Sequence, residues 1–417
     1  MWNRCDLHNS EIVGKNGRKK NRGFILSLTA LMIAAAGIIP AVRQLTRPKS
    51  GNAEQELERL VTDTVKSNKQ IKNCVLFVKK GDGSFAWSGA AGIASQNGQV
   101  PMRKDTPIYM ASVTKLFTAA AIMKLHEKGA IDLDGPMAKY LPADMIRGIH
   151  VCQGHDYSDE ITVKQLLEQT SGIADYYDEK AKDGKTMFEL FVAEPTRTWT
   201  VEETIARARD EMTPNFKPGT AASYSDTNYQ LLGKIIECVT GKPLEAVYEE
   251  FFFRPLKLKH TWLVGRSRPR VAPSAAIADV FSGDRDITSI RSNGAYWADG
   301  GIVSNVAEAV AFLQALTDGK IIRHDTLELM HKTWHQLPNM PLKYGFGTMK
   351  FEISAFIKGA AEAPLVWGHS GSTGVFLYYA EGPDLYMAGT IDQTEDKIRP
   401  IMLMIDAMQV IAHANNR

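Results

Sequence analysis

The hydrophobic and polar positions of the chain predict strands near both ends and helices between them. An amphipathic pattern predicts a helix over 54–67, and alternating patterns predict two strands, 71–78 and 84–92, joined by a glycine-rich turn. The C-terminal part repeats the strand signal at 344–351, 365–369, 374–380 and 385–391, followed by a helix at 397–413. The segment between is mostly helical, with helices predicted over 163–169, 201–211, 229–240 and 244–253.

This order predicts an α+β fold built from both chain ends and carrying a helical insertion. We expect residues 53–130 and 300–417 to form the α/β part, and residues 131–299 to form the mostly helical inserted domain. A glycine pair at 300–301 and a predicted helix over 306–316 open the second α/β segment.

The N-terminal region has the pattern of an export segment. Residues 1–23 are polar and basic, residues 24–42 contain no charged side chain, and residues 43–52 form a polar linker. A run of this length favours a transmembrane anchor, and a cleaved signal segment is the alternative. Either interpretation places the rest of the chain outside the cytoplasm, at the cell surface or in a periplasm.

Composition limits the kinds of partner. The 417 residues are 44% hydrophobic and 23% charged, with a net charge of +2. These values are typical of a globular protein, and beyond the N-terminal segment there is no basic run that would bind nucleic acid. We therefore expect no nucleic-acid partner.

The first chemical signal is Ser112-Val113-Thr114-Lys115. Ser112 is the only serine in the chain with a lysine three residues later, and a helical apolar pattern runs from there to Gly129. Ser112 and Lys115 therefore lie one turn apart on one helix face. A lysine that loses its proton can activate a serine nucleophile, and the helix N-terminus suits a developing oxyanion. The alternative is a helix-capping serine beside a solvated lysine.

Two later runs carry further candidate chemistry. Tyr224-Ser225-Asp226-Thr227-Asn228 precedes a predicted helix, so Asp226 or Thr227 could simply cap that helix. A phenol such as Tyr224 can also shuttle a proton near a lysine.

The run 367–374, Trp-Gly-His-Ser-Gly-Ser-Thr-Gly, joins two predicted strands. Its glycines either make a tight turn or allow a substrate to approach the backbone.

Other hydrolytic chemistries lack their motifs. No serine has glycine at both the second position before it and the second after it, which excludes the nucleophile elbow of α/β-hydrolases. His331 and His335 are four residues apart but have no glutamate in the metalloprotease position. The four cysteines show no zinc-like spacing. No metal site is predicted.

Taken in order, these runs resemble the motifs of the serine β-lactamase and penicillin-binding-protein superfamily. The tyrosine in the second motif and His369-Ser370-Gly371 in the third are similar to the class C β-lactamase and D-alanyl-D-alanine carboxypeptidase branch. The resemblance spans about residues 55–412 and implies an antiparallel sheet flanked by helices, with neither a metal nor an organic cofactor. Its substrates are small esters, amides or peptides.

The resemblance also implies roles for residues. Ser112 is the acylated nucleophile, Lys115 its base and Tyr224 the partner in proton transfer. His369 takes the place of a lysine in the third motif, beside Ser370 and Gly371. The backbone N–H groups of Ser112 and Ser372 form the oxyanion hole.

Two positions depart from the family pattern. Asp226 stands where an asparagine is usual, so it favours the charged form of Lys115 and offers no hydrogen-bond donor to a substrate carbonyl. Asn228 is the alternative donor. His369 is largely neutral near pH 7, which weakens binding of a substrate carboxylate.

We therefore predict an exported serine hydrolase that cleaves an ester or amide through a Ser112 acyl-enzyme, similar to the carboxylesterase and peptidase members of the family. A membrane-tethered, penicillin-recognising sensor with little turnover is one alternative, and an acyltransferase is another. The sequence leaves the oligomeric state open.

Overall fold

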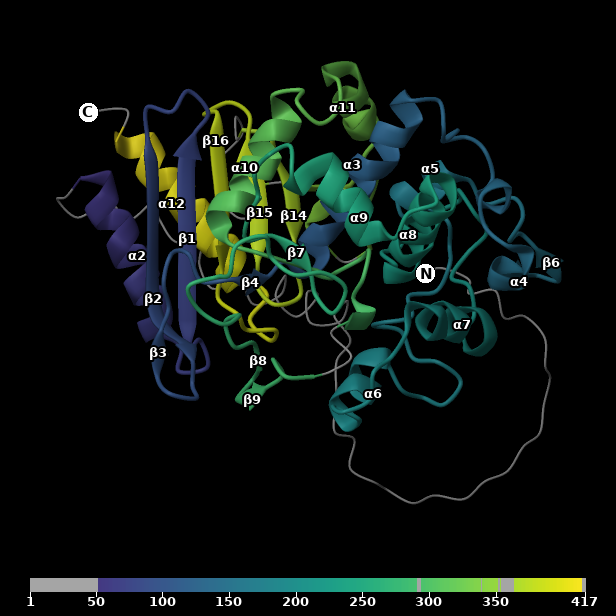
Figure 1. Ribbon diagram of the computed structural model, residues 1–417, viewed down its shortest axis with the longest axis horizontal. Coiled ribbons are helices and arrows are strands. Elements are labelled where there is room, and N and C mark those ends of the chain that lie inside the picture. Colours follow the sequence, from purple (N-terminus) through teal and green to yellow (C-terminus); the bar gives the residue numbers. More distant parts are fainter. Residues whose placement is uncertain (1–51, 291–293, 339, 352, 354–363, 415–417) are drawn as a thin grey trace.

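The computed structural model describes residues 52–290, 294–338, 340–351, 353 and 364–414. Its central element is an antiparallel sheet with the strand order β11-β12-β13-β14-β15-β16-β1-β2-β3 (Figure 1). The strands are β1 (Asn73–Lys80), β2 (Ala86–Ser95), β3 (Val100–Pro101), β11 (His335–Gln336), β12 (Leu342–Tyr344), β13 (Met349–Phe351), β14 (Val366–Ser370), β15 (Phe376–Ala380) and β16 (Leu385–Thr390).

Strands from the two ends of the chain meet inside this sheet. β1 pairs with β16 on one side and with β2 on the other, and Val75 lies opposite Thr390 in the register. This pairing confirms the predicted α+β fold made from both chain ends. One strand prediction was wrong: 344–351 is not continuous, because the chain turns between β12 and β13, where Gly347 has a φ of +65°.

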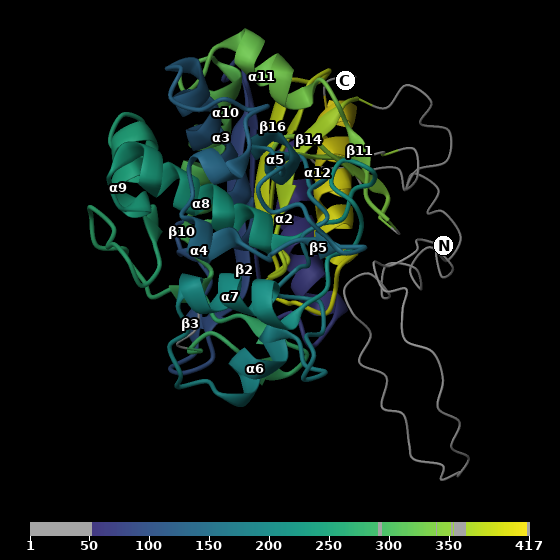
Figure 2. The same cartoon turned by 90° about the vertical axis from the view of Figure 1, so that its right-hand side faces the viewer.

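Helices cover both faces of the sheet. Figure 2 shows α2 (Ala53–Ser67) and α12 (Arg399–Ala414) on one face, and α10 (Val306–Thr317) and α3 (Thr114–Glu127) on the other. α2 begins where the Asn52 side chain accepts a hydrogen bond from the Gln55 N–H at 2.9 Å, and it buries Leu57 and Val61. The predicted arrangement, an antiparallel sheet flanked by helices, is confirmed.

Most of the remaining helices lie beside the sheet, on the side where α3 runs (Figure 1). They are α4 (Ala143–Ile146), α5 (Val163–Leu167), α6 (Met187–Ala193), α7 (Val201–Glu211), α8 (Asp226–Thr240), α9 (Leu244–Tyr248) and α11 (His324–His331), with the 3₁₀ helices Ala111–Val113 and Met137–Lys139 and a π-helix at Glu249–Phe253. α5, α6 and α7 each begin with a capping box, in which a threonine and the Gln or Glu three residues later bond each other's backbone. The limits 53–130, 131–299 and 300–417 stay a prediction.

Short strands complete the molecule, and one set of them positions the site. β10 (Ile302–Ser304) pairs with β4 (Ile108–Tyr109) and with β7 (Trp262–Leu263), which brings the chain before Ser112 against the segment after residue 300. The others are β5 (Val151–Cys152), β6 (His155–Asp156), β8 (Phe281–Ser282) and β9 (Arg285–Asp286).

The predicted export segment is outside the part of the chain that the structure describes. Residues 1–23, 24–42 and all of the linker 43–52 except Asn52 fall there. Among the described helices, none combines the length and apolar character needed to cross a membrane.

Candidate active site

Ser112 lies in a 3₁₀ turn, Ala111–Val113, which leads directly into α3, so the serine stands at the N-terminal end of this helix. The preceding residue, Ala111, has a φ of +42°, a conformation that is uncommon for a residue with a Cβ. Two hydrogen bonds fix this turn against β10: Met110 N–H donates to the Ile302 carbonyl at 2.8 Å, and Ile302 N–H donates to Thr114 Oγ1 at 3.0 Å. The serine is therefore held at the meeting point of α3 and the post-300 segment.

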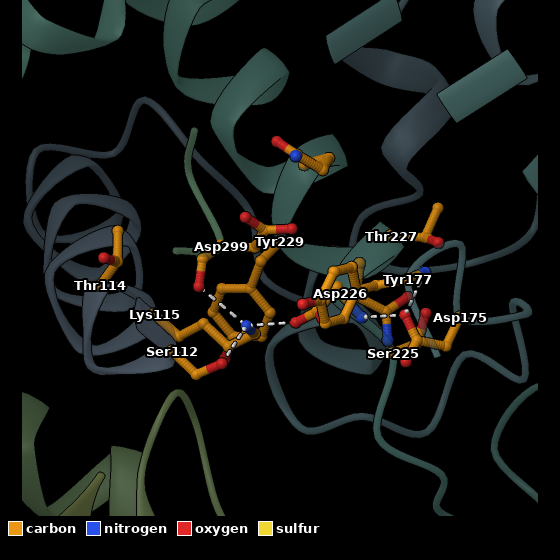
Figure 3. A network of polar contacts seen from close by, with 12 residues as sticks. Ser112, Thr114, Lys115, Asp175, Tyr177, Ser225, Asp226, Thr227, Tyr229 and Asp299 are labelled. Carbon is orange, nitrogen blue, oxygen red and sulfur yellow. Dashed lines mark hydrogen bonds and ion pairs between the residues drawn. The ribbon is translucent and has the colours of Figure 1, made fainter. Parts of the chain in front are cut away.

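Lys115 points back along α3 toward this serine (Figure 3). Its Nζ donates to Ser112 Oγ at 3.1 Å and to the Asp299 carbonyl at 2.8 Å, and it forms an ion pair with Asp226. The lysine is fully buried. Three contacts match the three N–H groups of an ammonium, which excludes the interpretation of Lys115 as a solvated surface side chain.

Asp226 is the first residue of α8, but its side chain does not cap that helix. Its backbone N–H donates to Asp175 Oδ1 at 3.1 Å, while its carboxylate turns toward Lys115 (Figure 3). The capping interpretation of this run is therefore wrong for Asp226.

Tyr224 reaches the site from the loop before α8. Gln169 holds this loop, since its carbonyl accepts from Ser223 N–H and its Oε1 accepts from Ser225 N–H, both at 3.0 Å. Lys115 Nζ lies 5.0 Å from the centre of the Tyr224 ring. The Tyr224 hydroxyl oxygen is buried, and no described residue makes a hydrogen bond of ordinary geometry to it. Burial, followed by the charge of Asp226, raises the pKa of Tyr224 well above its usual value, so the residue is a neutral phenol.

His369 does not offer a cation to the pocket. It is fully buried, Nδ1 donates to the Ser370 carbonyl at 2.7 Å, and Nε2 accepts from the Tyr344 hydroxyl at 3.1 Å. Burial, followed by the charge of Lys115, lowers the pKa of His369 to about 3. The histidine is therefore neutral, and both of its nitrogens are already bonded, so the structure corrects the expectation that it replaces the lysine of the third motif in contact with substrate.

The other residues of the third motif differ in position: Ser370 and Gly371 are bonded within the protein, whereas Ser372 lines the cavity. Ser370 Oγ bonds the Tyr378 hydroxyl at 2.9 Å, Gly371 N–H donates to the Val375 carbonyl at 2.7 Å, and neither residue is among those that line the cavity beside Ser112. Ser372 lies at the pocket together with Thr373. The predicted oxyanion partners, Ser112 and Ser372, therefore line the same cavity.

Asn228 is also placed differently from the expectation. It is fully buried in α8; Nδ2 donates to Gln169 Oε1 at 2.6 Å, and Oδ1 accepts from the Ser171 hydroxyl at 2.7 Å. Because both ends of the amide are bonded within the protein, Asn228 holds the Tyr224 loop and is not a substrate donor.

The cavity beside Ser112 has a polar floor and an apolar wall. About 660 Å³ of space, part of it open to solvent, lies between its lining residues. Asp226, Asp299, Ser112 and Ser372 contribute the polar groups. The wall consists of aromatic and aliphatic side chains: Tyr109, Tyr177, Phe188, Val280, Ile287, Ile290 and Tyr296.

Several carboxyl groups near this floor were missed by the sequence reasoning. Burial, followed by the charge of Asp226, raises the pKa of Asp299 to about 8 and that of Asp178 to about 7, and it raises the pKa of Asp175 well above the usual value. Asp299 directly precedes the glycine pair at 300–301, but that pair marks only the start of the second α/β segment and gives no reason to choose its acidic neighbour.

Lys397 is the second cation close to the site. Its Nζ donates to the Ser372 carbonyl at 3.2 Å, on the loop that carries the predicted oxyanion donor. Burial lowers the pKa of Lys397, while the charge of Asp178 opposes that shift. In the described part of the chain, no group of three or more His, Cys, Asp or Glu side chains is arranged to hold a metal ion.

Comparison with known proteins identifies the family of this chain. The family described as Beta-lactamase matches residues 62–399. A putative D-alanyl-D-alanine carboxypeptidase of Escherichia coli is 26% identical over 400 residues, which cover 85% of this chain and 86% of that protein. A D-aminopeptidase of Cereibacter sphaeroides is 25% identical over 294 residues, covering 70% of this chain and 50% of that protein.

A solved structure shares both fold and sequence. The D-stereospecific amidohydrolase from Streptomyces is 27% identical with a TM-score of 0.68, and the match covers 84% of this chain and 97% of that chain. Other relatives are longer: the chain spans only 39% of the length of a matched Staphylococcus aureus protein.

Proposed function

Because this chain belongs to the beta-lactamase family, a family of serine hydrolases, we propose that it cleaves amide or peptide bonds through an acyl-enzyme on Ser112. The observation that carries the proposal is the 3.1 Å contact between Lys115 Nζ and Ser112 Oγ, made by a fully buried lysine at the edge of a cavity. This is the contact that a serine nucleophile activated by an amine requires.

The reaction follows from the positions of three side chains. Lys115, as the neutral amine, takes the Ser112 hydroxyl proton while Oγ bonds to the substrate carbonyl carbon. The oxyanion that forms is stabilised by the N–H groups of Ser112 and Ser372. The C–N bond then breaks, and the leaving amine takes a proton from the neutral Tyr224 hydroxyl, which recovers one from Lys115. Water then attacks the acyl carbon of the Ser112 ester while Lys115 takes a proton from it. The ester bond breaks, Ser112 Oγ recovers a proton, and the acid is released.

Amides and peptides are favoured over β-lactams by the two departures from the family motifs. Asp226 cannot donate a hydrogen bond to the side-chain carbonyl of a penicillin or cephalosporin, and His369 is neutral and cannot attract their carboxylate. The names of the matched carboxypeptidase, aminopeptidase and amidohydrolase point to amide bonds as well. Esters remain within the chemistry of the site, since an alcohol is a better leaving group than an amine.

The experiment is a comparison of wild-type protein with Ser112→Ala on a panel of amino-acid p-nitroanilides, p-nitrophenyl esters and a cephalosporin. We expect wild-type turnover of the anilides or esters and a loss of at least about 1,000-fold in Ser112→Ala. Ser84→Ala, a serine of the exposed β1–β2 turn, is the matched control and should keep full activity. Undiminished turnover by Ser112→Ala contradicts the proposal.

Mass spectrometry separates hydrolysis from the two alternatives. A single acyl group that stays on Ser112 for hours supports a sensor, whereas rapid multiple turnover without an adduct supports a hydrolase. Product formed with an added amine in place of water supports an acyltransferase.

A carboxypeptidase is a second candidate, favoured by Lys397. Its ammonium lies 3.2 Å from the Ser372 carbonyl, where it can provide the positive charge that His369 lacks. If the substrate carries a C-terminal carboxylate, Lys397→Met raises KM for a free D-Ala-D-Ala peptide much more than for the same peptide with an amidated C-terminus. Equal effects on both peptides contradict this role.

We also propose that the protein acts outside the cytoplasm, anchored through residues 24–42. The support is the uncharged run behind a basic segment. Fractionation of cells that express the full chain, or a chain without residues 1–42, tests this: only the full chain should sediment with membranes, and recovery of both in the soluble fraction contradicts the anchor.

A further inference from the structure

We propose that Asp226 selects substrates whose acyl group carries a positively charged amine, with a bulky apolar side chain packed against the pocket wall. This inference rests on the proposed function, because it concerns the acyl group that Ser112 receives. It identifies the substrate class as amino-acyl amides or peptides with a free amino end.

The geometry places the carboxylate of Asp226 within reach of a ligand. Asp226 and Lys115 form an ion pair in which the lysine side chain has no exposed surface, whereas 11% of the aspartate side chain remains exposed. Asp226 is also part of the cavity lining and Lys115 is not. A ligand that enters the cavity therefore meets the negative member of the pair.

The residue type decides what such a ligand must offer. An asparagine at this position has an N–H group to donate, but an ionised aspartate only accepts hydrogen bonds. A substrate that presents an ammonium group supplies both the N–H donors and the opposite charge. A substrate that presents an amide carbonyl at the same place meets repulsion from the carboxylate.

A second carboxyl group, that of Asp299, belongs to the same cavity lining as Asp226. Asp299 lines the cavity and is 2% exposed; its Oδ2 accepts from the Tyr176 hydroxyl at 2.7 Å, and no described group donates a hydrogen bond to its Oδ1. A buried carboxyl oxygen without a partner is costly, and a donor on the ligand would remove that cost.

The charges around the floor also favour a cationic ligand. The carboxyl groups of Asp175, Asp178 and Asp299 lie near Asp226, and their raised pKa values favour their neutral forms, so the carboxylate of the Lys115–Asp226 ion pair is the negative charge that a ligand in the cavity meets. Lys115 is already bonded to Ser112, Asp226 and the Asp299 carbonyl, and Lys397 to the Ser372 carbonyl. The charge of Asp226 raises the pKa of the other three carboxyl groups, in addition to the effect of burial. An ammonium beside Asp226 would relieve this repulsion.

The apolar wall suits the rest of such an acyl group. Tyr177, Phe188 and Tyr296 belong to one aromatic cluster, in which the ring centres of Tyr177 and Tyr296 are 5.4 Å apart. An aromatic or branched aliphatic side chain on the carbon that bears the amine can pack against these rings while its ammonium contacts the carboxylates.

The test compares two substrates that differ only in the amine: phenylalanine p-nitroanilide, in both enantiomers, and 3-phenylpropionic acid p-nitroanilide. We expect wild-type kcat/KM to be at least about tenfold higher for one enantiomer of the amine-bearing substrate. Asp226→Asn should reduce this ratio to about one or below. Removing the partner of Lys115 lowers kcat/KM for both substrates by the same factor, so this general loss does not change the ratio of the two values.

Asp175→Asn is the matched control. It also removes a carboxylate near the site, but Asp175 is outside the cavity lining, and the Oδ1 of an asparagine can still accept from the Asp226 and Tyr177 N–H groups. We expect the ratio in Asp175→Asn to stay close to that of the wild type. A wild-type ratio near one, or a ratio that survives in Asp226→Asn, overturns the inference and leaves the proposed function intact.

A binding measurement tests the inference without turnover. Phenethylamine should raise the melting temperature of Ser112→Ala more than 2-phenylethanol does at the same concentration, and this difference should disappear in the Ser112→Ala/Asp226→Asn double variant. Equal shifts for the amine and the alcohol overturn the inference. Loss of all Ser112 acylation, together with a preserved amine preference in binding, overturns the proposed function instead.

Discussion

Lys115 and Asp226 are in direct contact at the floor of the cavity, 111 positions apart in the chain, and only the aspartate has any exposed surface. The contact holds the lysine toward Ser112. The same carboxylate is thus a structural partner of the base and the part of the ion pair that a substrate meets.

Removing the cation of this pair should cost both stability and activity. Lys115→Met leaves a largely buried carboxylate without its partner, which costs about 3–5 kcal/mol in comparable ion pairs. We expect a clear fall in melting temperature and a loss of at least about 1,000-fold in kcat/KM.

The double variant Lys115→Met/Asp226→Asn separates the two effects. Because it removes the unpaired charge, it should recover most of the lost melting temperature while the activity stays absent. A double variant no more stable than Lys115→Met would show that the ion pair is not what stabilises this region.

Tyr224→Phe should cost activity but not stability. The hydroxyl is buried, and no hydrogen bond of ordinary geometry reaches it from the described residues, although the Ser112 side chain interacts with it. Its removal should therefore change the melting temperature little. If the hydroxyl transfers the proton to the leaving group, kcat falls by about 100- to 10,000-fold. Thermal unfolding and steady-state kinetics on the same preparation check both, and a full kcat excludes this role.

Gly371→Ala should displace the loop that carries Ser372, the proposed oxyanion donor. A Cβ at this position would lie 2.8 Å from Ala111 Cβ and 3.0 Å from the Met110 carbonyl oxygen, so β14 and the turn before α3 would have to separate. We expect a loss of about tenfold or more in kcat, because a displacement of about 1 Å already matters for a reacting group. Gly382→Ala is the control, since its nearest neighbour, Pro364 Cβ, is at 3.5 Å and the variant should behave like the wild type.

Asp392 should make stability depend on pH. Burial raises its pKa from 3.8 to about 7, and its Oδ2 has no hydrogen-bond partner among the described residues. Because the folded state then binds more protons than the unfolded state between about pH 4 and pH 7, stability falls as the pH rises through that window. The upper bound of this loss is about 4 kcal/mol.

Asp392→Asn should remove this dependence. Asparagine cannot ionise, and it tolerates the positive φ of +44° at this position. The variant should melt at a higher temperature than the wild type at pH 8, with the difference shrinking toward pH 5. A difference that is the same at both pH values would contradict the assignment to Asp392.

The alternating apolar pattern was enough to predict the longer strands of the sheet and its construction from both chain ends, but not the two-residue strands β3 and β11, which are too short to show a pattern. The prediction for 344–351 fails because a strand pattern does not show that the backbone reverses at Gly347. The helix predicted after Ser112 was also right, although the serine lies in the 3₁₀ turn before it.

His369 and Asn228 show where the sequence was misleading. Each belongs to a motif whose residue type suggested contact with substrate, yet each is fully buried and bonded to the protein at both of its polar atoms. A motif gives the residue type and its order in the chain, but the direction of a side chain depends on what packs around it. Tyr344, which occupies Nε2 of His369, is 25 positions away in the chain.

The sequence by itself determined that Ser112 and Lys115 share one helix face, because a three-residue spacing corresponds to one helical turn wherever the helix lies. Only the tertiary structure decided the environment of that pair. Lys115 bonds the carbonyl of Asp299, 184 positions away, and the carboxylate of Asp226 arrives on a separate helix. Local spacing fixes which side chains are neighbours along a helix. Burial and charge at a site depend on segments that meet only after the chain has folded, and here those segments bring the carboxyl groups of Asp226 and Asp299 into the same cavity as Ser112, the proposed nucleophile.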